Sequence, residues 1–374
     1  MARHDNGIYY FLGTITSHVL HALPLHKVLG GTFVVTSKNA AETLKEYGVP
    51  VVCLDDIPHI LKWQGRRPHR ITHYTALDKR FTKTADYLNS HAKVVLFYEL
   101  FDIASELTLT TPKKIFLTHG NMLKNYFKMH PRRLEIIKQY DYMAALGPFM
   151  KQEFIRSGID QKKLVEIGIA RTDEVTALAK KVAVSDILTR AGVPSTKPIV
   201  SYLPTFWGDS SVESLGVKLL ENIPDSYTML FRPHPQTPSK ILKHYKQVLA
   251  RKNIFYLPED GPTSPSLLDI YAASSVIVGD VSSVMLEAIL LDRPLIFMSP
   301  DTKTNIEPHD QLRTIREFSE LISDSNVSEV DTALATSIKR GIDLQTWSDS
   351  KDNAFFHHDG TSVKSIAVFV RQLL

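Results

Sequence analysis

The stretch LFRPHPQTP, residues 230–238, places an arginine and a proline-bracketed histidine directly after the apolar run YTMLF. The two prolines hold the backbone of His234 extended and remove amide donors beside it. Arg232 supplies a planar cation that suits phosphate oxygens. We therefore predict that Arg232 and His234 bind an anionic ligand at the end of a strand. The alternative is a capped strand end that carries a surface histidine.

A second polar turn follows another apolar strand in SVIVGDVSSVMLEAILLDRPLIFM, residues 275–298. Its hydroxyls and backbone N–H groups meet at the start of a helix, which suits phosphate oxygens. Glu287 lies one helical turn past Ser283, where its carboxylate can accept hydrogen bonds from the vicinal hydroxyls of a ribose. The alternative is that Asp280 or Ser282 only caps the helix and Glu287 is solvated. The ligand contacts predicted from this stretch are Asp280, Ser282, Ser283 and Glu287.

A third candidate is the stretch KKIFLTHGNMLKNYF, residues 113–127, in which an apolar strand runs into His119. Gly120 permits a sharp turn or a close backbone approach to a ligand, and Lys124 follows about one helical turn later. Histidine is the side chain best suited to take up a proton near neutral pH. His119 is therefore a candidate general base; the alternative is a core histidine bonded to backbone.

Two shorter stretches add candidates. VSYLPTFWGD places Pro204 and Thr205 in a turn after a strand, with Trp207 nearby for stacking. VEIGIARTDEV places Arg171 and Asp173 after a glycine that ends a strand.

Short, continuous apolar runs alternate with amphipathic stretches along the whole chain, and this pattern predicts the elements that must position these residues. Continuous apolarity is typical of strands buried on both faces, as in a parallel sheet covered by helices. A break at RAGVPSTKPIV predicts two α/β halves that join near residue 195. Two such halves in tandem favour a ligand site between them, at the carboxyl ends of the strands.

Composition limits the class of protein. With 43% hydrophobic and 22% charged residues among 374, the chain is typical of a globular protein. The single cysteine, Cys53, excludes an internal disulfide framework and fits a reducing compartment. We find neither a signal peptide nor an apolar run long enough to span a membrane, and we predict a cytoplasmic location.

Basic residues interleave with aromatic and apolar ones near residues 62–70 and 122–133. Solvated helix faces would explain these stretches. They also fit peripheral contact with an anionic membrane surface at the inner face of the cell membrane. Neither resembles a nucleic-acid module, and we predict no nucleic-acid partner.

The motifs HG..LK, G.ARTDE, YLPT, FRPHP, DVSSV and RPLIF, in this order over roughly residues 113–300, resemble the CDP-glycerol glycerophosphotransferase family of teichoic-acid enzymes. The resemblance implies a GT-B fold, with two Rossmann-like domains whose parallel sheets face across a cleft. Residues 1–190 would bind the acceptor and residues 191–374 the nucleotide donor, with the last helix crossing back.

The resemblance also implies roles for single residues. His119 would deprotonate the acceptor hydroxyl, with Gly120, Lys124 and Arg171 on the acceptor side. Arg232 and His234 would lie at the donor diphosphate. The serine pair, with Asp280, Pro204 and Thr205, would complete the donor site.

The expected reaction moves glycerol phosphate from CDP-glycerol to a lipid-linked or polymeric cell-surface glycan. Helix N-termini and Arg232 can stabilise a leaving nucleotide phosphate without a metal. Because we find no Asp-x-Asp pair and no zinc-ligand spacing, we predict no metal and no cofactor.

The chain departs from the family pattern at Asn121 and Met122, where the family usually has Thr and Pro. It departs again at Val281 and Glu287, where the family usually has Tyr and Asp. A Glu one turn into this helix is common where GT-B transferases hold the ribose of a sugar nucleotide. The alternatives are therefore a CDP-ribitol donor, a GT-B glycosyltransferase that uses a nucleotide sugar, a sugar-nucleotide 2-epimerase, or a non-catalytic nucleotide- or glycan-binding module.

Overall fold

The computed structural model describes residues 6–13, 18–55, 81–101, 103–118, 131–179, 182–194, 196–206, 210–258, 264–280, 282–299 and 316–374. These residues form two compact units. Unit 1 contains the described residues up to Asp173 together with Phe355–Leu374, and unit 2 contains Glu174–Ala354. Along the described residues the chain therefore passes from one unit to the other twice, after Asp173 and after Ala354.

Unit 1 is built on a seven-stranded sheet in the order β3-β2-β1-β4-β5-β6-β7, and every pair is parallel. Its central strands are buried along their whole length, as the continuous apolar runs predict. The strands are β1 (Ile8–Gly13), β2 (Thr32–Val35), β3 (Val51–Cys53), β4 (Val94–Phe97), β5 (Lys113–Phe116), β6 (Tyr142–Ala145) and β7 (Leu164–Glu166).

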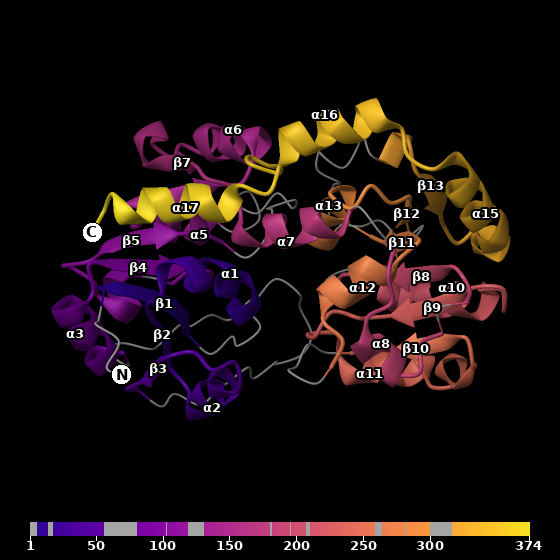
Figure 1. Ribbon diagram of the computed structural model, residues 1–374, viewed down its shortest axis with the longest axis horizontal. Coiled ribbons are helices and arrows are strands. Elements are labelled where there is room, and N and C mark those ends of the chain that lie inside the picture. The colour runs from indigo at the N-terminus through magenta and orange to yellow at the C-terminus, as the bar shows by residue number, and fades with distance from the viewer. Residues whose placement is uncertain are drawn as a thin grey trace. The chain divides into compact units, whose positions relative to one another are not determined.

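The helices of unit 1 include one from the far end of the sequence. Helix α17 packs beside α1, and Figure 1 shows this yellow helix near the indigo α1. The helices are α1 (Val19–Leu29), α2 (Lys38–Glu46), α3 (Thr82–His91), the π-helical turn η2 (Ile103–Leu107), α5 (Pro131–Ile137), α6 (Pro148–Arg156), the 3₁₀ turn η3 (Gln161–Lys163) and α17 (Ser362–Arg371). Helix α7 (Ala170–Leu178) spans the boundary between the units.

Unit 2 is built on a six-stranded parallel sheet in the order β10-β9-β8-β11-β12-β13. The prediction of an α/β chain with two parallel sheets is therefore confirmed. The strands are β8 (Ile199–Tyr202), β9 (Thr228–Phe231), β10 (Ile254–Tyr256), β11 (Val276–Gly279), β12 (Leu295–Met298) and β13 (Glu320–Ile322).

One amphipathic stretch of unit 2, PSKILKHYKQVLARK, forms a short α-helix and two 3₁₀ turns in place of one regular helix. Tyr245 and Val248 are buried three residues apart, a spacing that a 3₁₀ geometry places on one side. The helices are α8 (Asp186–Arg190), α9 (Ser211–Ser214), α10 (Gly216–Asn222), α11 (Ser239–Leu242), η4 (Lys243–Tyr245), η5 (Val248–Ala250), α12 (Leu267–Ala273), α13 (Ser283–Ile289), η6 (Val327–Glu329), α15 (Val330–Arg340) and α16 (Leu344–Ala354).

Three aromatic rings stack in the core of unit 2 and link β8, β9 and η4. Phe231 stacks on Tyr202, with ring centroids 5.4 Å apart, and on Tyr245, with centroids 4.9 Å apart. A Cβ atom at Gly216 would lie 2.2 Å from the Tyr245 hydroxyl oxygen, so glycine is required where α10 crosses these rings. The stack fixes the ends of β8 and β9, from which the candidate loops start.

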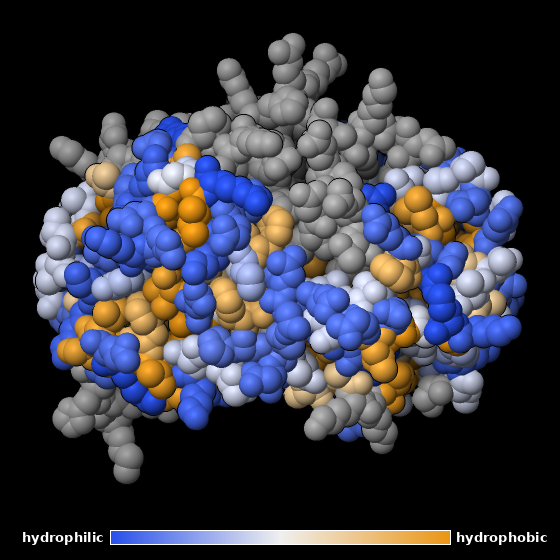
Figure 2. Space-filling model, turned by 90° about the horizontal axis from the view of Figure 1, so that it is seen from above, coloured by the Kyte–Doolittle hydropathy of each residue, from blue (hydrophilic) through white to orange (hydrophobic). Residues whose placement is uncertain are grey.

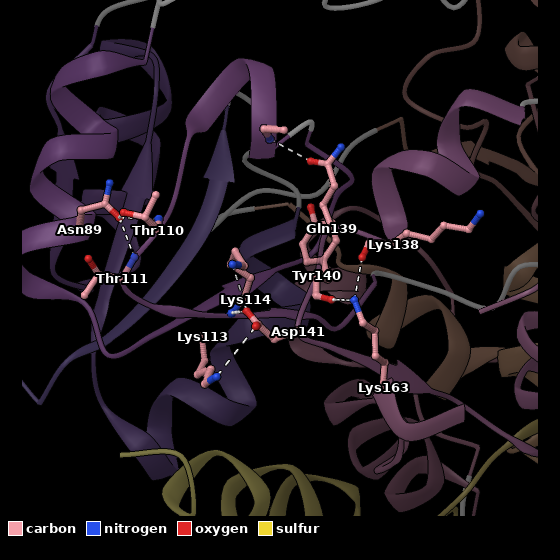
Figure 3. Close-up of polar contacts among 11 residues, drawn as sticks. Asn89, Thr110, Thr111, Lys113, Lys114, Lys138, Gln139, Tyr140, Asp141 and Lys163 are labelled. Carbon is pink, nitrogen blue, oxygen red and sulfur yellow. Dashed lines mark hydrogen bonds and ion pairs between the residues drawn. The ribbon is translucent and has the colours of Figure 1, made fainter. Parts of the chain in front are cut away.

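The amino-terminal edge of the unit 1 sheet is held by lysines and one aspartate (Figure 3). Asp141 accepts a hydrogen bond from the backbone N–H of Lys114 at 2.9 Å and lies 3.2 Å from the Lys114 Nζ. Lys163 Nζ donates to the carbonyl oxygens of Lys138 and Tyr140 at 2.8 and 2.9 Å. Because these contacts satisfy backbone groups at the start of β5 and β6, this edge has a structural role.

No helix among the described residues is long and apolar enough to cross a membrane. The large hydrophobic side chains that are exposed on the described residues are spread over both units. On the face that Figure 2 shows, orange and blue residues are interspersed.

Candidate functional site

Three loops leave adjacent strands at the carboxyl edge of the unit 2 sheet. They follow β9, β8 and β11, which are neighbours in the sheet. Tyr202, the last residue of β8, pairs with Val278 of β11, so the two strands end at the same level. The structure therefore brings together, within one unit, the candidate residues that the sequence predicts on these loops.

Asp280 joins two of the loops. Its side chain accepts hydrogen bonds from the backbone N–H of Thr205 at 2.7 Å, from the N–H of Ser211 at 3.0 Å and from Ser211 Oγ at 2.7 Å. Asp280 is only 4% exposed. These contacts favour a role in holding the β8 loop against the β11 loop; direct contact of Asp280 with a ligand stays a prediction.

Tyr202 extends this network into the core. Its hydroxyl lies 2.9 Å from Ser211 Oγ. The only hydroxyl hydrogen of Ser211 is already engaged in the hydrogen bond that it donates to Asp280. The Tyr202 O–H is therefore the donor in this pair. Burial, followed by the proximity of Tyr245 and Asp280, raises the pKa of Tyr202 well above its ordinary value, which keeps that proton in place.

The turn between β11 and α13 has the predicted form. Ser282 is the N-cap of α13, and its Oγ accepts a hydrogen bond from the Val284 N–H at 3.3 Å. Gly279 has no room for a side chain, because a Cβ atom there would lie 2.5 Å from Met285 Sδ and 3.1 Å from the Leu203 oxygen. The glycine thus permits the close approach of strand, helix and β8 loop.

Glu287 is buried, with 7% of its surface exposed, so the alternative of a solvated side chain is wrong. Tyr271 on α12 directs its hydroxyl both at Glu287 Oε2 and at the Val284 oxygen, each 3.2 Å away. The Tyr271 proton is shared between these two acceptors. Glu287 is thus held beside α12, and its contact with a ribose stays a prediction.

Arg232 is also buried, at 7% exposed. Its backbone N–H donates to the Tyr202 oxygen at 3.1 Å, which continues the β8–β9 pairing past the strand end. Its Nη1 donates to the Pro265 oxygen at 3.0 Å, in the segment that leads into α12. The guanidinium therefore lies under the carboxyl edge rather than on the open surface.

His234 lies in a turn closed by the hydrogen bond from the Thr237 N–H to the His234 oxygen at 2.8 Å. Its Nδ1 accepts a hydrogen bond from the Gln236 N–H at 3.1 Å. The ring stacks on Phe206, with centroids 4.1 Å apart and an interplanar angle of 25°. Phe206 was missed by the sequence reasoning, which named Trp207, a residue outside the described ones. Phe206 and His234 follow their strands by four and three positions, and they meet because β8 and β9 are adjacent in the sheet, an order that the sequence alone does not give.

The first-half candidates His119, Gly120 and Lys124 lie outside the described residues. Thr118, directly before them, is 4% exposed and has φ of +56°, in the left-handed region that β-branched residues avoid. Such strain persists only where the surroundings impose it, and it is often found at functional sites. Arg171 is placed on α7, with 4% of its surface exposed.

Asp173, of the same ARTDE stretch, binds the C-terminal helix. Its two carboxylate oxygens accept hydrogen bonds from the Ser362 and Val363 N–H groups, each at 2.9 Å. A Cβ atom at Gly168 would lie 2.6 Å from both the Phe356 oxygen and Ser362 Oγ. The glycine and the aspartate of this motif thus anchor α17 in unit 1, a role that the sequence did not indicate for either residue.

The arginine of the RPLIF motif is structural as well. Arg293 donates to the carbonyl oxygens of Ser274, Ala179 and Leu291 at 3.1, 3.1 and 2.9 Å. Burial lowers its pKa from the ordinary value, although Asp292 opposes that shift. Arg293 therefore joins three segments at the side of the sheet away from the candidate loops.

Within the described ranges no three or more His, Cys, Asp or Glu side chains are grouped so that they could hold a metal ion. The predicted independence of metal stays a prediction.

The fold and these loops match a known family. The profile of CDP-Glycerol:Poly(glycerophosphate) glycerophosphotransferase matches residues 56–357, so the chain belongs to this family. One curated relative is the teichoic acid glycerol-phosphate primase of Bacillus subtilis (strain 168), 25% identical over 238 residues, which cover 59% of this chain and 58% of the relative. Another is the teichoic acid glycerol-phosphate transferase of Staphylococcus aureus, 25% identical over 196 residues, or 49% of this chain and 46% of the relative. The chain thus spans less than two thirds of the length of these relatives.

Solved structures show the same fold. The wall teichoic acid polymerase TagF aligns with a TM-score of 0.66 at 15% identity, over 98% of this chain and 88% of that chain. Anabaena Alr3699/HepE, in complex with UDP-glucose, aligns with a TM-score of 0.59 at 12% identity, over 98% of each chain. The prediction of a GT-B-like α/β fold is confirmed.

Proposed function

We propose that this protein transfers glycerol phosphate from CDP-glycerol to a lipid-linked or polymeric cell-surface glycan. Membership of the glycerophosphotransferase family supports the reaction class. The observation that carries the proposal is the convergence of Arg232, His234 and the Ser282 turn at one sheet edge.

In this proposal the unit 2 loops hold the donor. Arg232 and His234 bind the diphosphate with Ser282 and Ser283, and Glu287 accepts hydrogen bonds from the ribose. Attack of an acceptor hydroxyl on the β-phosphorus releases CMP, whose phosphate gains negative charge as the bond breaks. Cations and N–H groups already directed at that oxygen lower the barrier because they need little reorganisation.

The proton of the acceptor hydroxyl goes to His119 in this proposal, with Gly120, Lys124 and Arg171 on the acceptor side. The strained backbone of Thr118 supports a functional role for the loop that follows β5. The assignment of the acceptor to residues 1–190 and of the donor to residues 191–374 stays a prediction.

Calorimetry and transfer assays test these assignments. CDP, CMP and CDP-glycerol should bind with affinity better than millimolar. Arg232→Ala should weaken donor binding by about 1.5–3 kcal/mol, the usual worth of a charge-assisted contact. His119→Ala should leave donor affinity nearly unchanged and lower turnover by about 10²–10⁴. A His119→Ala protein with near-normal turnover would remove His119 as the base, and a protein that binds none of these nucleotides would refute the proposal.

A nucleotide-sugar donor is the second candidate. It is favoured by Glu287, whose carboxylate is buried one turn into α13, where GT-B transferases commonly hold the ribose of a sugar nucleotide. A panel of CDP-glycerol, CDP-ribitol and UDP-sugars, assayed with and without EDTA, separates the donors. Full activity in EDTA supports metal independence.

We also propose that the protein acts in the cytoplasm, peripherally at an anionic membrane. The supporting stretches near residues 62–70 and 122–133 lie largely outside the described residues. Sedimentation with anionic and neutral liposomes tests this, because binding through charge should weaken as salt is raised.

A further inference from the structure

The His234 ring is held by two contacts that come from different parts of the unit 2 sheet edge. One is the Gln236 N–H, which donates to Nδ1 at 3.1 Å within the same turn. The other is the Phe206 ring on the neighbouring β8 loop, with centroids 4.1 Å apart. The first contact determines which ring nitrogen carries the proton, and the second determines the orientation of the ring plane.

The Gln236 contact determines the tautomer. A backbone N–H can only donate, so Nδ1 must present its lone pair and cannot carry a proton. The proton of the neutral ring is therefore on Nε2. A histidine in this state offers Nε2–H as a donor, which is the form that a phosphate oxygen requires.

The Phe206 contact determines the plane of the ring. An interplanar angle of 25° is a stacked arrangement, in which rotation about the ring's side-chain bonds would lose the shared face. Pro235 adds to this order, because it occupies the second position of the turn that the Thr237 N–H closes, where proline pre-sets the backbone. The ring is thus oriented before any ligand binds.

We infer that Phe206 and the Gln236 N–H are positioning groups that hold His234 as an Nε2–H donor aimed along one direction. The inference deepens the proposed function and rests on it for the identity of the ligand, a nucleoside diphosphate oxygen. Phe206 touches neither donor nor acceptor in this role and acts only through His234. His234 then serves as a hydrogen-bond donor to the leaving phosphate and not as a base.

Three variants separate orientation from folding. Phe206→Leu removes the ring face while keeping a hydrophobic side chain, and Phe206→Tyr restores the face. Pro235→Ala is at an exposed position and loosens the turn with little risk to the fold. Phe255→Leu, at a half-buried phenylalanine of β10, is the matched control for loss of a ring elsewhere in unit 2.

The first readout is the ¹⁵N NMR spectrum of histidine-labelled protein, in which the His234 signals are assigned by their loss in His234→Gln. The wild type should show an unprotonated Nδ1 and a protonated Nε2 at neutral pH. Phe206→Leu and Pro235→Ala should move these signals toward a mixture of tautomers, and Phe206→Tyr should not. A wild-type ring protonated at Nδ1, or signals unchanged in Phe206→Leu, would overturn the inference.

The second readout is transfer from CDP-glycerol. A small misplacement of a reacting group costs up to about 100-fold in rate, so we expect kcat to fall between about 10- and 100-fold in Phe206→Leu, with KM nearly unchanged. Phe206→Tyr should recover most of the rate, and Phe255→Leu should match the wild type. Equal losses in Phe206→Leu and Phe255→Leu would overturn the inference. If the wild type fails to use CDP-glycerol but shows the expected tautomer, the proposed function fails and the assignment of Phe206 and Gln236 holds.

Discussion

Asp280 in unit 2 and Asp173 in unit 1 both join distant chain segments, but they differ in burial and in the groups that donate hydrogen bonds to them. Asp280 is almost fully buried and accepts three hydrogen bonds, one of them from a hydroxyl. Asp173 is half-buried and accepts two, both from N–H groups at the start of α17. Asp280 binds neighbouring loops beside the candidate site, whereas Asp173 binds a helix 189 residues away.

The difference predicts which carboxylate contributes more to the free energy of unfolding. Without Asp280, the N–H groups of Thr205 and Ser211 would be buried with no acceptor. Without Asp173, the N–H of the buried Ser362 loses its acceptor, whereas the N–H of the half-buried Val363 can turn to water. We therefore expect the two junctions to respond differently to the same substitution.

The largest effect should come from Asp280→Ala. Each buried N–H left without an acceptor costs about 1–3 kcal/mol, so the free energy of unfolding should fall by about 3–5 kcal/mol. Urea denaturation monitored by circular dichroism measures it. Asp280→Asn, which keeps one acceptor oxygen, is the control and should lose less. A loss below about 1 kcal/mol in Asp280→Ala would mean that water replaces the carboxylate.

Gly168→Ala should come next, and Gly48→Ala is its matched control. The two glycines have φ of +66° and +67°, but a Cβ atom meets nothing within 4 Å at Gly48. The left-handed conformation alone costs about 1–2 kcal/mol, so Gly48→Ala reports that cost. Gly168→Ala should lose about 1–3 kcal/mol more, because its Cβ overlaps the Phe356 oxygen and Ser362 Oγ. Equal losses in the two variants would show that α17 adjusts freely.

Asp173→Ala should lower the free energy of unfolding by about 1 kcal/mol, as for loss of a helix cap. Burial, the largest cause, raises the pKa of Asp173 above its ordinary value despite the two backbone hydrogen bonds. The folded state therefore holds this proton more tightly than the unfolded state. Tighter binding of this proton stabilises the folded protein. The stabilisation is fully present below the pKa of Asp173 in the unfolded chain, about 3.9, and it is lost as pH rises through the pKa in the folded protein.

Comparison with Asp173→Asn isolates this titration, because the amide keeps one acceptor and does not ionise. The stability of the wild type relative to Asp173→Asn should decrease as pH rises from about 3.9. A relative stability that increases over this range would show that the hydrogen bonds outweigh burial.

The smallest effect should come from His357→Ala. His357 is exposed, and its Nε2 lies 3.1 Å from both the Glu166 oxygen and Ser365 Oγ. These contacts join β7 to α17, so they are structural, and because His357 is exposed we expect its removal to lower the free energy of unfolding by less than about 1 kcal/mol. Turnover should change by no more than about 2-fold, far from the 10²–10⁴ of a general base. A large loss of turnover would make His357 the base in place of His119.

The alternation of apolar runs and amphipathic stretches was enough to predict both parallel sheets. SVIVGDVSS is the clearest case: β11 ends at Gly279 and Ser282 caps α13, as the local residue types indicate. Local signals of this kind survive because strand burial and helix capping depend on residues close in the sequence.

The contacts that complete the site were not predictable in the same way. Asp280 bonds to Thr205 and Ser211, 75 and 69 residues away, and Phe206 meets His234 only because β8 pairs with β9. A single sequence gives no strand order, so the hydrogen bonds from the β8 loop to Asp280 were not predicted; the predicted ligand contact of Asp280 remains untested. The role of Asp173 was hidden for the same reason.

The return of α17 to unit 1 has a consequence for the order of folding during synthesis. The described residues of unit 2 all lie between Glu174 and Ala354, and they can collapse as soon as this part of the chain has left the ribosome. Unit 1 begins first but must wait for Phe355–Leu374 before α1 acquires its partner. Nascent domains generally finish in order from the N-terminus, and here that order is reversed. The apolar face of α1 that α17 covers is therefore exposed throughout the synthesis of unit 2, when a chaperone can bind it.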